Sequence, residues 1–225
     1  MENGIQIAID GPAAAGKSTI AKITASKLGY TYIDTGAMYR ALTYKALKEH
    51  IDVYDDDALS QLLERIVIEL EPTENGQIVR VDGADVTDAI RSQEVTSNVS
   101  ATAAQPRVRE MMVEKQRLLA TSKGVVMDGR DIGTAVLPSA ELKIYMTASV
   151  EERAARRFVE NTKRGIDRPL DQLCQDISNR DKADMERVAS PLKQASDAIL
   201  IDTTSMSIEE VADTIIQHAE KRKSR

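Results

Sequence analysis

Eight residues near the N-terminus constrain the fold of this chain more than any other part of its sequence. The segment Gly11-Pro-Ala-Ala-Ala-Gly-Lys-Ser18 fits the pattern G-x-x-x-x-G-K-[ST]. An apolar run, Ile5–Ile9, comes before it, and a helical pattern, Lys17–Leu28, comes after it. Glycines let backbone N–H groups wrap around phosphates, and the N-terminus of the following helix adds positive partial charge. The segment therefore predicts a phosphate-binding loop that holds a nucleoside triphosphate.

The loop also assigns chemistry to single residues. Lys17 can reach the β- and γ-phosphates, and the Ser18 hydroxyl can bind Mg²⁺. The motif reads phosphates and not the base, so it neither chooses between ATP and GTP nor names the acceptor of a phosphoryl group. The residues predicted to bind the triphosphate are Gly11, Pro12, Ala13, Ala14, Ala15, Gly16, Lys17, Ser18 and Thr19.

Strands and helices alternate along most of the remaining chain. Helical patterns, among them residues Ala37–Lys48 and Ile208–His218, separate short apolar runs that are typical of buried strands. This order predicts an α/β fold of the three-layer P-loop NTPase type, with a five-stranded parallel sheet between helices and phosphate sites at the strand C-terminal ends. The four further runs are Thr31–Ile33, Gly124–Met127, Leu142–Met146 and Ala198–Ile201.

The middle of the chain breaks this alternation. Residues Ile66–Glu71 and Gln77–Asp82 each alternate apolar and polar side chains, and Asn75-Gly76 lies between them. Asn-Gly between alternating runs is a strong signal for a β-hairpin. We interpret residues from about 62 to 105 as a small antiparallel insertion with some helix. It interrupts a single domain of residues 1–225 whose core is made of residues 1–61 and 106–225.

Composition narrows the function classes. A net charge of −6 argues against a general nucleic-acid binder, because phosphate backbones select basic surfaces. Cys174 is the only cysteine, which excludes an intrachain disulfide and a Cys-rich zinc site, and the two histidines disfavour a His-based metal site or triad. The N-terminus lacks a signal-peptide pattern and no window reaches roughly 20 apolar residues, so we expect a cytoplasmic protein.

Two other readings of the motifs fit poorly. A GTPase switch needs an [NT]-K-x-D element to read guanine, and the segment Thr162–Gly165 lacks the aspartate. The tripeptide Asp34-Thr-Gly36 matches the active-site tripeptide of aspartic proteases, but those enzymes are all-β and need two such carboxylates side by side. This chain carries one copy in an α/β pattern.

A kinase needs cations that screen the charge between two anionic substrates. The second half of the chain is rich in arginine, and Arg153, Arg156 and Arg157 have the i, i+3, i+4 spacing that places them on one face of a helix. Several segments then resemble, in order and over nearly the whole chain, the signatures of the bacterial cytidylate kinase family. They are Asp10–Ser18, Asp34–Arg40, Pro106–Glu110, Asp128–Thr134, Glu151–Arg157, Arg180–Arg187 and Ser190–Leu192.

The resemblance implies an enzyme of pyrimidine nucleotide metabolism that moves the γ-phosphate of ATP, with Mg²⁺, onto CMP or dCMP. It implies that Arg40 binds the acceptor phosphate and that Thr35 offers the acceptor a hydroxyl. Ser100, Arg109 and Asp131 match the positions that read cytosine, where an arginine faces the acceptor edge and an oxygen accepts from the amino group. The positions that contact the pentose and the acceptor phosphate match Arg180, Asp184 and Arg187.

The catalytic set implied by the resemblance is Lys17, Arg130, Arg153 and Arg157, which would stabilise charge on the transferring phosphoryl group. No side-chain nucleophile is required, because such catalysis is positioning plus electrostatics. Residues 158–169 are expected to form a short mobile lid over the phosphates. Asp128 either holds Mg²⁺ through water or caps the loop.

Two alternatives stay open at this point. A related P-loop kinase could use another small acceptor, such as UMP, AMP or shikimate. A nucleotide-dependent switch could bind a partner without transferring phosphate. The substrates expected here are ATP and CMP or dCMP. No sequence feature demands an oligomer, so we expect a monomer.

Overall fold

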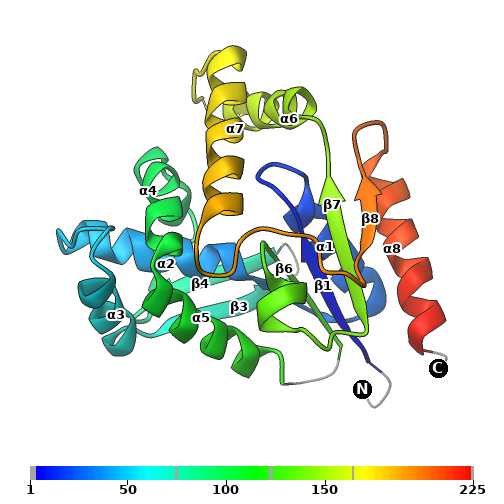
Figure 1. The fold of residues 1–225 in the computed structure, drawn as a ribbon, viewed down its shortest axis with the longest axis horizontal. Coiled ribbons are helices and arrows are strands. Elements are labelled where there is room, and N and C mark those ends of the chain that lie inside the picture. Colours follow the sequence, from blue (N-terminus) through cyan, green and yellow to red (C-terminus); the bar gives the residue numbers. More distant parts are fainter. Residues whose placement is uncertain (1–3, 74–75, 122–123, 164, 224–225) are drawn as a thin grey trace.

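A five-stranded parallel sheet forms the centre of the molecule (Figure 1), in a computed structural model that describes residues 4–73, 76–121, 124–163 and 165–223. The strand order is β2-β6-β1-β7-β8, and every neighbouring pair is parallel. The predicted sheet is therefore confirmed, with the ends of its strands slightly shifted. The strands are β1 (Gln6–Asp10), β2 (Thr31–Asp34), β6 (Val125–Gly129), β7 (Leu142–Thr147) and β8 (Ile199–Asp202).

Helices cover both faces of this sheet and extend beyond one edge of it. Figure 1 shows α8 along the outer side of β8, and α2 to α5 on the opposite side of the molecule. The helices are α1 (Lys17–Leu28), α2 (Thr35–Lys48), α3 (Asp56–Arg65), α4 (Gln93–Ala104), α5 (Pro106–Leu119), α6 (Val150–Lys163), α7 (Leu170–Glu186) and α8 (Ile208–Lys223). A 3₁₀ turn, η1 (Ala89–Arg91), precedes α4, and a short π-type turn, η2 (Ile132–Val136), follows β6.

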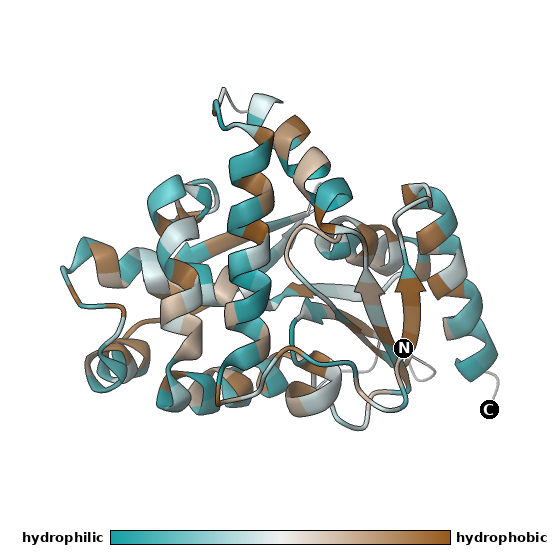
Figure 2. Ribbon diagram, turned by 45° about the horizontal axis from the view of Figure 1, so that its top comes forward, coloured by the Kyte–Doolittle hydropathy of each residue, from teal (hydrophilic) through white to brown (hydrophobic). Residues whose placement is uncertain are grey.

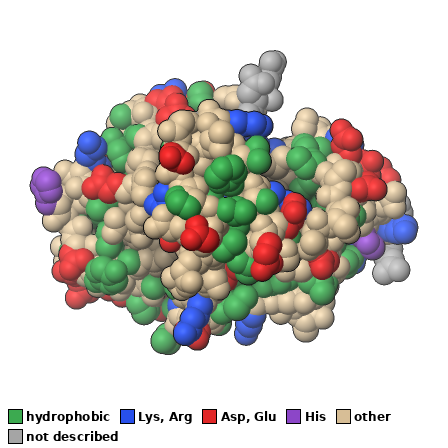
Figure 3. All heavy atoms as spheres, turned by 90° about the horizontal axis from the view of Figure 1, so that it is seen from above, with side chains coloured by type: hydrophobic (Ala, Val, Ile, Leu, Met, Phe, Trp, Pro, Cys, Tyr) green, Lys and Arg blue, Asp and Glu red, His purple; other side chains and the backbone are tan. Residues whose placement is uncertain are grey.

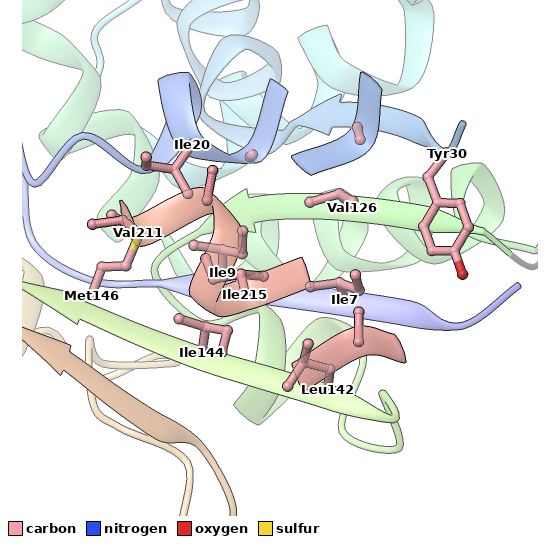
Figure 4. Close-up of a cluster of buried hydrophobic side chains, with 14 of the residues drawn as sticks. Ile7, Ile9, Ile20, Tyr30, Val126, Leu142, Ile144, Met146, Val211 and Ile215 are labelled. Atoms are coloured by element: carbon pink, nitrogen blue, oxygen red, sulfur yellow. The ribbon is translucent and has the colours of Figure 1, made fainter. Parts of the chain in front are cut away.

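The strands alternate their side chains between two buried layers, as the period of two in a strand requires. Ile7 and Ile9 point into a cluster with α1 and α8 (Figure 4), whereas Ala8 faces a second cluster that includes α5 and η2. Figure 2 shows hydrophobic residues along the strands of this sheet and long hydrophilic stretches on the outer helix α8. Burial on both faces fixes β1 rigidly, and the phosphate loop begins at its end.

The predicted insertion forms a second, antiparallel sheet in the order β3-β4-β5. Its strands are β3 (Ile68–Thr73), β4 (Gly76–Val81) and β5 (Ala84–Asp85). The β3–β4 ladder confirms the predicted hairpin, although Asn75 itself lies outside the described residues. The expected start of the insertion at about residue 62 falls inside α3, a helix that the sequence reading did not identify.

The insertion is tied to the edge of the main sheet by one carboxamide. Gln77 Nε2 donates to the Tyr32 carbonyl oxygen over 3.1 Å, and its Oε1 accepts from the Asp34 amide over 3.4 Å. The side chain thus pairs with edge strand β2 as a neighbouring strand would. Asp34 in turn caps α2, because its carboxylate accepts from the Ala37 amide over 2.9 Å.

The segment expected to be a lid, residues 158–169, is divided in the structure. Its first part continues α6 to Lys163, and residues 165–169 connect α6 to α7. Arg164 lies outside the described residues. None of the helices described is both long and apolar enough to cross a membrane.

Gly11 generates the first testable prediction. Its φ is +147°, and a Cβ built on it would lie 2.0 Å from the Met146 carbonyl oxygen in β7. Gly11→Ala should therefore lower the free energy of unfolding by about 2–5 kcal/mol, because backbone strain and overpacking add. Urea unfolding followed by circular dichroism measures this loss.

The matched control is Gly83→Ala. Gly83 also has a positive φ, +79°, but a Cβ there would have no neighbour within 4 Å. Gly83→Ala should therefore lower the free energy of unfolding by only about 1 kcal/mol, because the unfavourable backbone conformation is its single cost. Equal losses in the two variants would show that the close approach to Met146 does not restrict residue 11.

Candidate active site

The phosphate loop, residues 11–18, joins the buried end of β1 to the first turn of α1. Gly16 takes the left-handed conformation at the N-cap, with φ of 85°, and Ala14 is left-handed as well, with φ of 59°. Left-handed residues next to right-handed ones are the backbone geometry that forms concave N–H sites for phosphate. The predicted strand–loop–helix context of the motif is therefore present.

Lys17 lies inside this loop and is buried. Its Nζ donates to the Pro12 carbonyl oxygen over 2.7 Å. Burial and the nearby Arg130 guanidinium lower the pKa of Lys17 to about 7, although Asp128 and Asp10 oppose the shift. The ammonium group thus lacks a strong anionic partner, and the phosphates of a nucleotide would supply one.

The carboxylate of Asp128, in β6, accepts a hydrogen bond from the phosphate loop. Ser18 Oγ donates to its Oδ2 over 2.8 Å, and the Tyr32 hydroxyl donates to its Oδ1 over 2.9 Å. Burial raises the pKa of Asp128 to about 6, with a further rise from Asp34, while Lys17 and the two hydroxyl groups act in the opposite sense. The carboxylate is therefore oriented toward Ser18 and carries incompletely compensated negative charge.

A second cluster, beside the loop, consists of buried arginines that repel one another. Burial and the neighbouring Arg180 and Arg157 lower the pKa of Arg40 to about 9, and burial and Arg130 lower the pKa of Arg180 to about 10. Both Arg40 and Arg180 remain protonated at neutral pH. Arg40 Nη1 is held by Thr96 Oγ1 at 2.8 Å and by the Ile90 carbonyl oxygen at 3.2 Å, and these partners carry no charge.

Asp184 partly balances this positive charge. Arg130 Nε donates to Asp184 Oδ2 over 2.9 Å, and Arg187 Nη1 lies 3.8 Å from Asp184 Oδ1. Burial opposes ionisation of Asp184, but Arg130, Arg180 and Arg187 outweigh it and lower its pKa. One carboxylate thus serves three guanidinium groups, which leaves positive charge available for an anion.

A buried ion pair lies beyond the arginine cluster. Arg109 Nη2 of α5 lies 2.5 Å from Asp131 Oδ2, and Arg187 Nη2 lies 3.6 Å from Asp131 Oδ1. Tyr39 packs against the Arg109 guanidinium, with 5.3 Å between the Arg109 Cζ and the ring centre. The group joins a planar donor and a carboxylate acceptor at one place, as recognition of a polar base edge requires.

Several buried donor atoms in this region have no hydrogen-bond partner among the described residues. They are Arg109 Nε, Arg168 Nε, Arg180 Nε and Arg187 Nη2. A buried donor without a partner is costly and uncommon in folded proteins. The arrangement is that of a site that becomes satisfied when a polar anionic ligand enters.

The phosphate loop, the arginine cluster and the Arg109–Asp131 pair line one cavity of about 1190 Å³. On the face seen from above, acidic, basic and hydrophobic side chains of the described residues are interspersed (Figure 3). Loop residues 13–19 line this cavity, and so do Arg109 and Asp131. The predicted residues outside the loop that line it are Thr35, Arg40, Ser100, Arg109, Arg130, Asp131, Arg157, Arg180, Asp184 and Arg187.

Arg153 is placed differently from the other predicted site residues. It is 4% exposed, it does not line the cavity, and its Nη1 binds both the Ala13 carbonyl oxygen at 3.0 Å and Asp181 Oδ2 at 2.5 Å. Asp181 Oδ1 also accepts from the Ala13 amide over 3.2 Å. In this structure Arg153 and Asp181 therefore anchor the backbone of the phosphate loop at Ala13, and neither lines the cavity. Gly11 and Pro12 likewise lie behind the lining.

The other arginines of α6 lie at the cavity. Arg156 donates to the Thr203 carbonyl oxygen over 2.7 Å, and Arg157 Nη1 lies 3.4 Å from Glu160 Oε2. The three arginines of α6 therefore do not all face the cavity, because Arg153 points toward the phosphate loop instead. Sequence reasoning also missed Tyr32 and Asp181 as supports of the site. Tyr32 sits in an apolar strand without a signal, whereas Asp181 lies within the quoted Arg180–Arg187 segment.

Comparison with known proteins identifies close relatives. A family model described as cytidylate kinase matches residues 7–221. The cytidylate kinase of Geobacillus sp. (strain WCH70) is 60% identical over 222 residues, which cover 99% of each chain. The cytidylate kinase of Bacillus subtilis (strain 168) is 57% identical with the same coverage.

Solved structures share the fold at low sequence identity. A shikimate kinase from Acinetobacter baumannii, in complex with shikimate, matches with a TM-score of 0.50 and 17% identity, over 98% of this chain and 96% of its own. An uncharacterized protein from Eubacterium ventriosum ATCC 27560 matches with a TM-score of 0.53 and 13% identity, over 96% and 98%. At these identities the matches establish the fold alone.

The lowered pKa of Lys17 generates a prediction about proton uptake. At pH 8 the free protein should hold Lys17 largely neutral, and bound phosphates should raise its pKa again, so binding of ATP should take up close to one proton. Calorimetric titration of ATP in buffers of different ionisation enthalpy measures this number. At pH 6 Lys17 is already protonated, and its share of the uptake should disappear.

Lys17→Arg is the control, because a guanidinium stays charged throughout this range. That variant should bind ATP at pH 8 without the uptake. If the wild-type protein and Lys17→Arg exchange the same number of protons at pH 8, then Lys17 is not the group that titrates.

Proposed function

The chain belongs to the cytidylate kinase family, and on this premise we propose that it transfers the γ-phosphate of ATP to CMP or dCMP, giving ADP and CDP or dCDP. One observation carries the proposal beyond the family match. A phosphate loop and a separate arginine cluster border the same cavity, and a donor–acceptor pair lies beyond the arginines. Two phosphorylated molecules can therefore be held end to end.

The loop is proposed to hold the donor. Its backbone N–H groups would bind the β- and γ-phosphates, and Lys17 would leave the Pro12 carbonyl oxygen to bind the phosphate oxygens. Transfer is in line, and the attacking group is a phosphate oxygen of the acceptor. No covalent intermediate on the protein is needed, because positioning and charge stabilisation supply the catalysis.

Ser18 and Asp128 are proposed to hold Mg²⁺ with the bound nucleotide. Both offer hard oxygen ligands, they lie 2.8 Å apart, and the raised pKa of Asp128 shows that its charge lacks a sufficient counter-ion. Mg²⁺ usually takes one or two carboxylates and completes its coordination with waters and substrate phosphates. The ion would supply neutralisation of charge on the phosphate oxygens during transfer.

The arginine cluster is proposed to hold the acceptor phosphate. Arg40 and Arg180 carry lowered pKa values because they are buried beside one another, and a phosphate dianion would relieve this repulsion. Arg130 lies between this cluster and Lys17, so it is placed to bind the phosphoryl group in transit. Asp184 would accept a hydrogen bond from a hydroxyl of the pentose.

The base site is proposed to consist of Ser100, Arg109 and Asp131, with Arg187 as a further partner of Asp131. Cytosine offers an amino donor beside two acceptors, which a carboxylate and a guanidinium match. Uracil presents the reversed edge and would leave buried partners unsatisfied, which can reduce kcat/KM by orders of magnitude. Thr35 Oγ1 donates to the Asp128 carbonyl oxygen over 2.7 Å, and its lone pairs can still accept from the acceptor.

Two of the sequence expectations take a more specific form. Arg157 would approach the transferring phosphoryl group when residues 158–169 close, with Arg168 from the same segment at the cavity. The catalytic role expected for Arg153 stays a prediction, and its contacts with Ala13 and Asp181 support an anchoring role for it. A monomeric state and a cytoplasmic location also stay predictions.

A panel of acceptors tests the proposed function. Release of ADP, measured by a coupled assay, should be fast with CMP and dCMP, slow with UMP and AMP, and near background without an acceptor. Lys17→Ala should lower turnover with every acceptor by at least about 100-fold, because charge stabilisation at the transferring group is lost. Turnover with AMP equal to that with CMP would refute cytosine selectivity, and no acceptor-dependent turnover would favour a switch.

Arg40→Ala tests the acceptor phosphate site. The variant should raise the KM for CMP about 10- to 100-fold, since a charge-assisted hydrogen bond is lost, while the affinity for ATP stays nearly unchanged. Arg40 pairs with neutral groups, so its removal leaves no carboxylate without a partner. Steady-state kinetics and ATP titration provide both numbers.

The matched control is Arg65→Ala, which removes an exposed arginine that pairs with Glu49. Its KM for CMP should equal that of the wild-type protein. An Arg40→Ala variant that keeps the wild-type KM would remove Arg40 from the acceptor site.

A further inference from the structure

Asp10 is a buried carboxylate that the mechanism above does not use. It is the last residue of β1 and directly precedes Gly11 of the phosphate loop. Its Oδ1 accepts from the Ile132 amide over 2.8 Å, and its Oδ2 accepts from the Gly133 amide over 2.7 Å. Both oxygens are therefore held by consecutive backbone N–H groups of η2, 122 and 123 positions away along the chain.

This placement puts a carboxylate in the interior of the protein. Burial raises the pKa of Asp10 to about 6, although the two amides act in the opposite sense. Above that pH the protein keeps a negative charge in its interior, and the two backbone N–H groups that hold the carboxylate compensate for part of the cost of burying it. The charge is retained where charge-assisted bonds fix the position of a particular segment.

The segment so fixed begins at Asp131. The two amides follow Asp131 directly, and the Asp131 carbonyl oxygen accepts from the Ala135 amide over 2.8 Å within the η2 turn. The backbone also packs closely on the outer side of the turn. A Cβ at Gly133 would lie 3.1 Å from Lys143 Cδ and 3.4 Å from Asp10 Oδ2. Little freedom is left for the backbone that carries the Asp131 side chain.

We propose that Asp10 is a positioning residue that sets the selectivity of the enzyme for cytosine. Its carboxylate fixes the turn after Asp131, and the turn aims the Asp131 carboxylate at Arg109 and Arg187. A small displacement of this backbone would misalign the donor–acceptor pair that reads the base. The inference rests on the proposed function, because it assigns Asp131 to the base site.

The placement also links the two substrate sites through one residue. Asp10 adjoins the donor loop in sequence and pairs in the sheet with Gly129 and Tyr145. Its side chain reaches the segment of the acceptor base site. The end of β1 thus fixes both the start of the phosphate loop and the orientation of Asp131.

Asp10→Asn is the test, because a carboxamide keeps the size but can accept with only one atom. Its NH₂ group would face one of the two backbone N–H groups, and one charge-assisted bond would become a repulsive contact. The readout is the ratio of kcat/KM for CMP to kcat/KM for UMP. We expect this ratio to fall by about 10-fold or more.

The ratio separates positioning from other effects of the substitution. Any change in ATP binding through the nearby Lys17 cancels, because both acceptors use the same donor site. Arg40→Ala should lower kcat/KM for CMP and for UMP by the same factor, because each acceptor carries a phosphate at the same position. Leu142→Ala should lower the stability of the protein without changing the ratio. Leu142 is a fully buried core residue of β7 outside the cavity lining. Thermal unfolding measures the stability that Asp10→Asn and Leu142→Ala each lose, so that the two losses can be compared.

A wild-type CMP-to-UMP ratio in Asp10→Asn would overturn the inference, as would a fall no larger than that of Leu142→Ala. The wild-type protein is assayed first. A wild-type enzyme without preference for CMP refutes the proposed function itself, and is thereby distinguished from failure of the role of Asp10.

If Asp10→Asn does not fold, the wild-type protein is tested directly by NMR. Titration with CMP should move the backbone amide resonances of Ile132 and Gly133 together with that of Asp131. Movement of the Asp131 resonance with both amides unmoved would show that the turn is not coupled to the base site, and would overturn the inference.

Discussion

Repulsion among buried guanidinium groups is the interaction on which the rest of this structure depends. Arg40, Arg130 and Arg180 line one cavity, and burial together with repulsion from neighbouring guanidinium groups lowers the pKa values of Arg40 and Arg180. A fold can hold such a cluster only if rigid elements on several sides prevent it from dispersing. α2, the end of β6 and α7 supply that restraint here, and the gathered positive charge favours phosphorylated ligands over neutral ones.

The parallel sheet distributes acidic groups along the same edge and gives each a separate task. Asp34 and Asp128 are partners in the register of β2 and β6, and Asp10 is paired with Gly129 beside them. Asp34 caps α2, Asp128 accepts from Ser18, and Asp10 holds the turn after Asp131. Three carboxylates at neighbouring strand ends thus hold the start of α2, the phosphate loop and the turn after Asp131 respectively. Parallel strands make this possible because their carboxyl ends meet at one edge.

The sequence predicted several features that are encoded within a few residues of one another. The loop with α1, the sheet strands and the hairpin were identified because glycine, apolar runs and Asn-Gly act within a few residues. The contacts of Asp10 and Arg153 could not be predicted, since their partners lie 122 and 140 residues away and only the sheet brings them together. Helical spacing placed Arg153 beside Arg157, but it could not tell which arginine turns inward. The helix α3 was missed, and the expected lid proved partly helical.

The carboxamide of Gln77 has a consequence for the behaviour of the protein in concentrated solution. An edge strand presents unpaired amide and carbonyl groups onto which the chain of another molecule can add. In β2 the Tyr32 carbonyl and the Asp34 amide are already occupied by Gln77, so this edge offers no template for intermolecular strand addition at those groups. One side chain therefore blocks cross-β association at this edge, which would otherwise need a further strand to cover it.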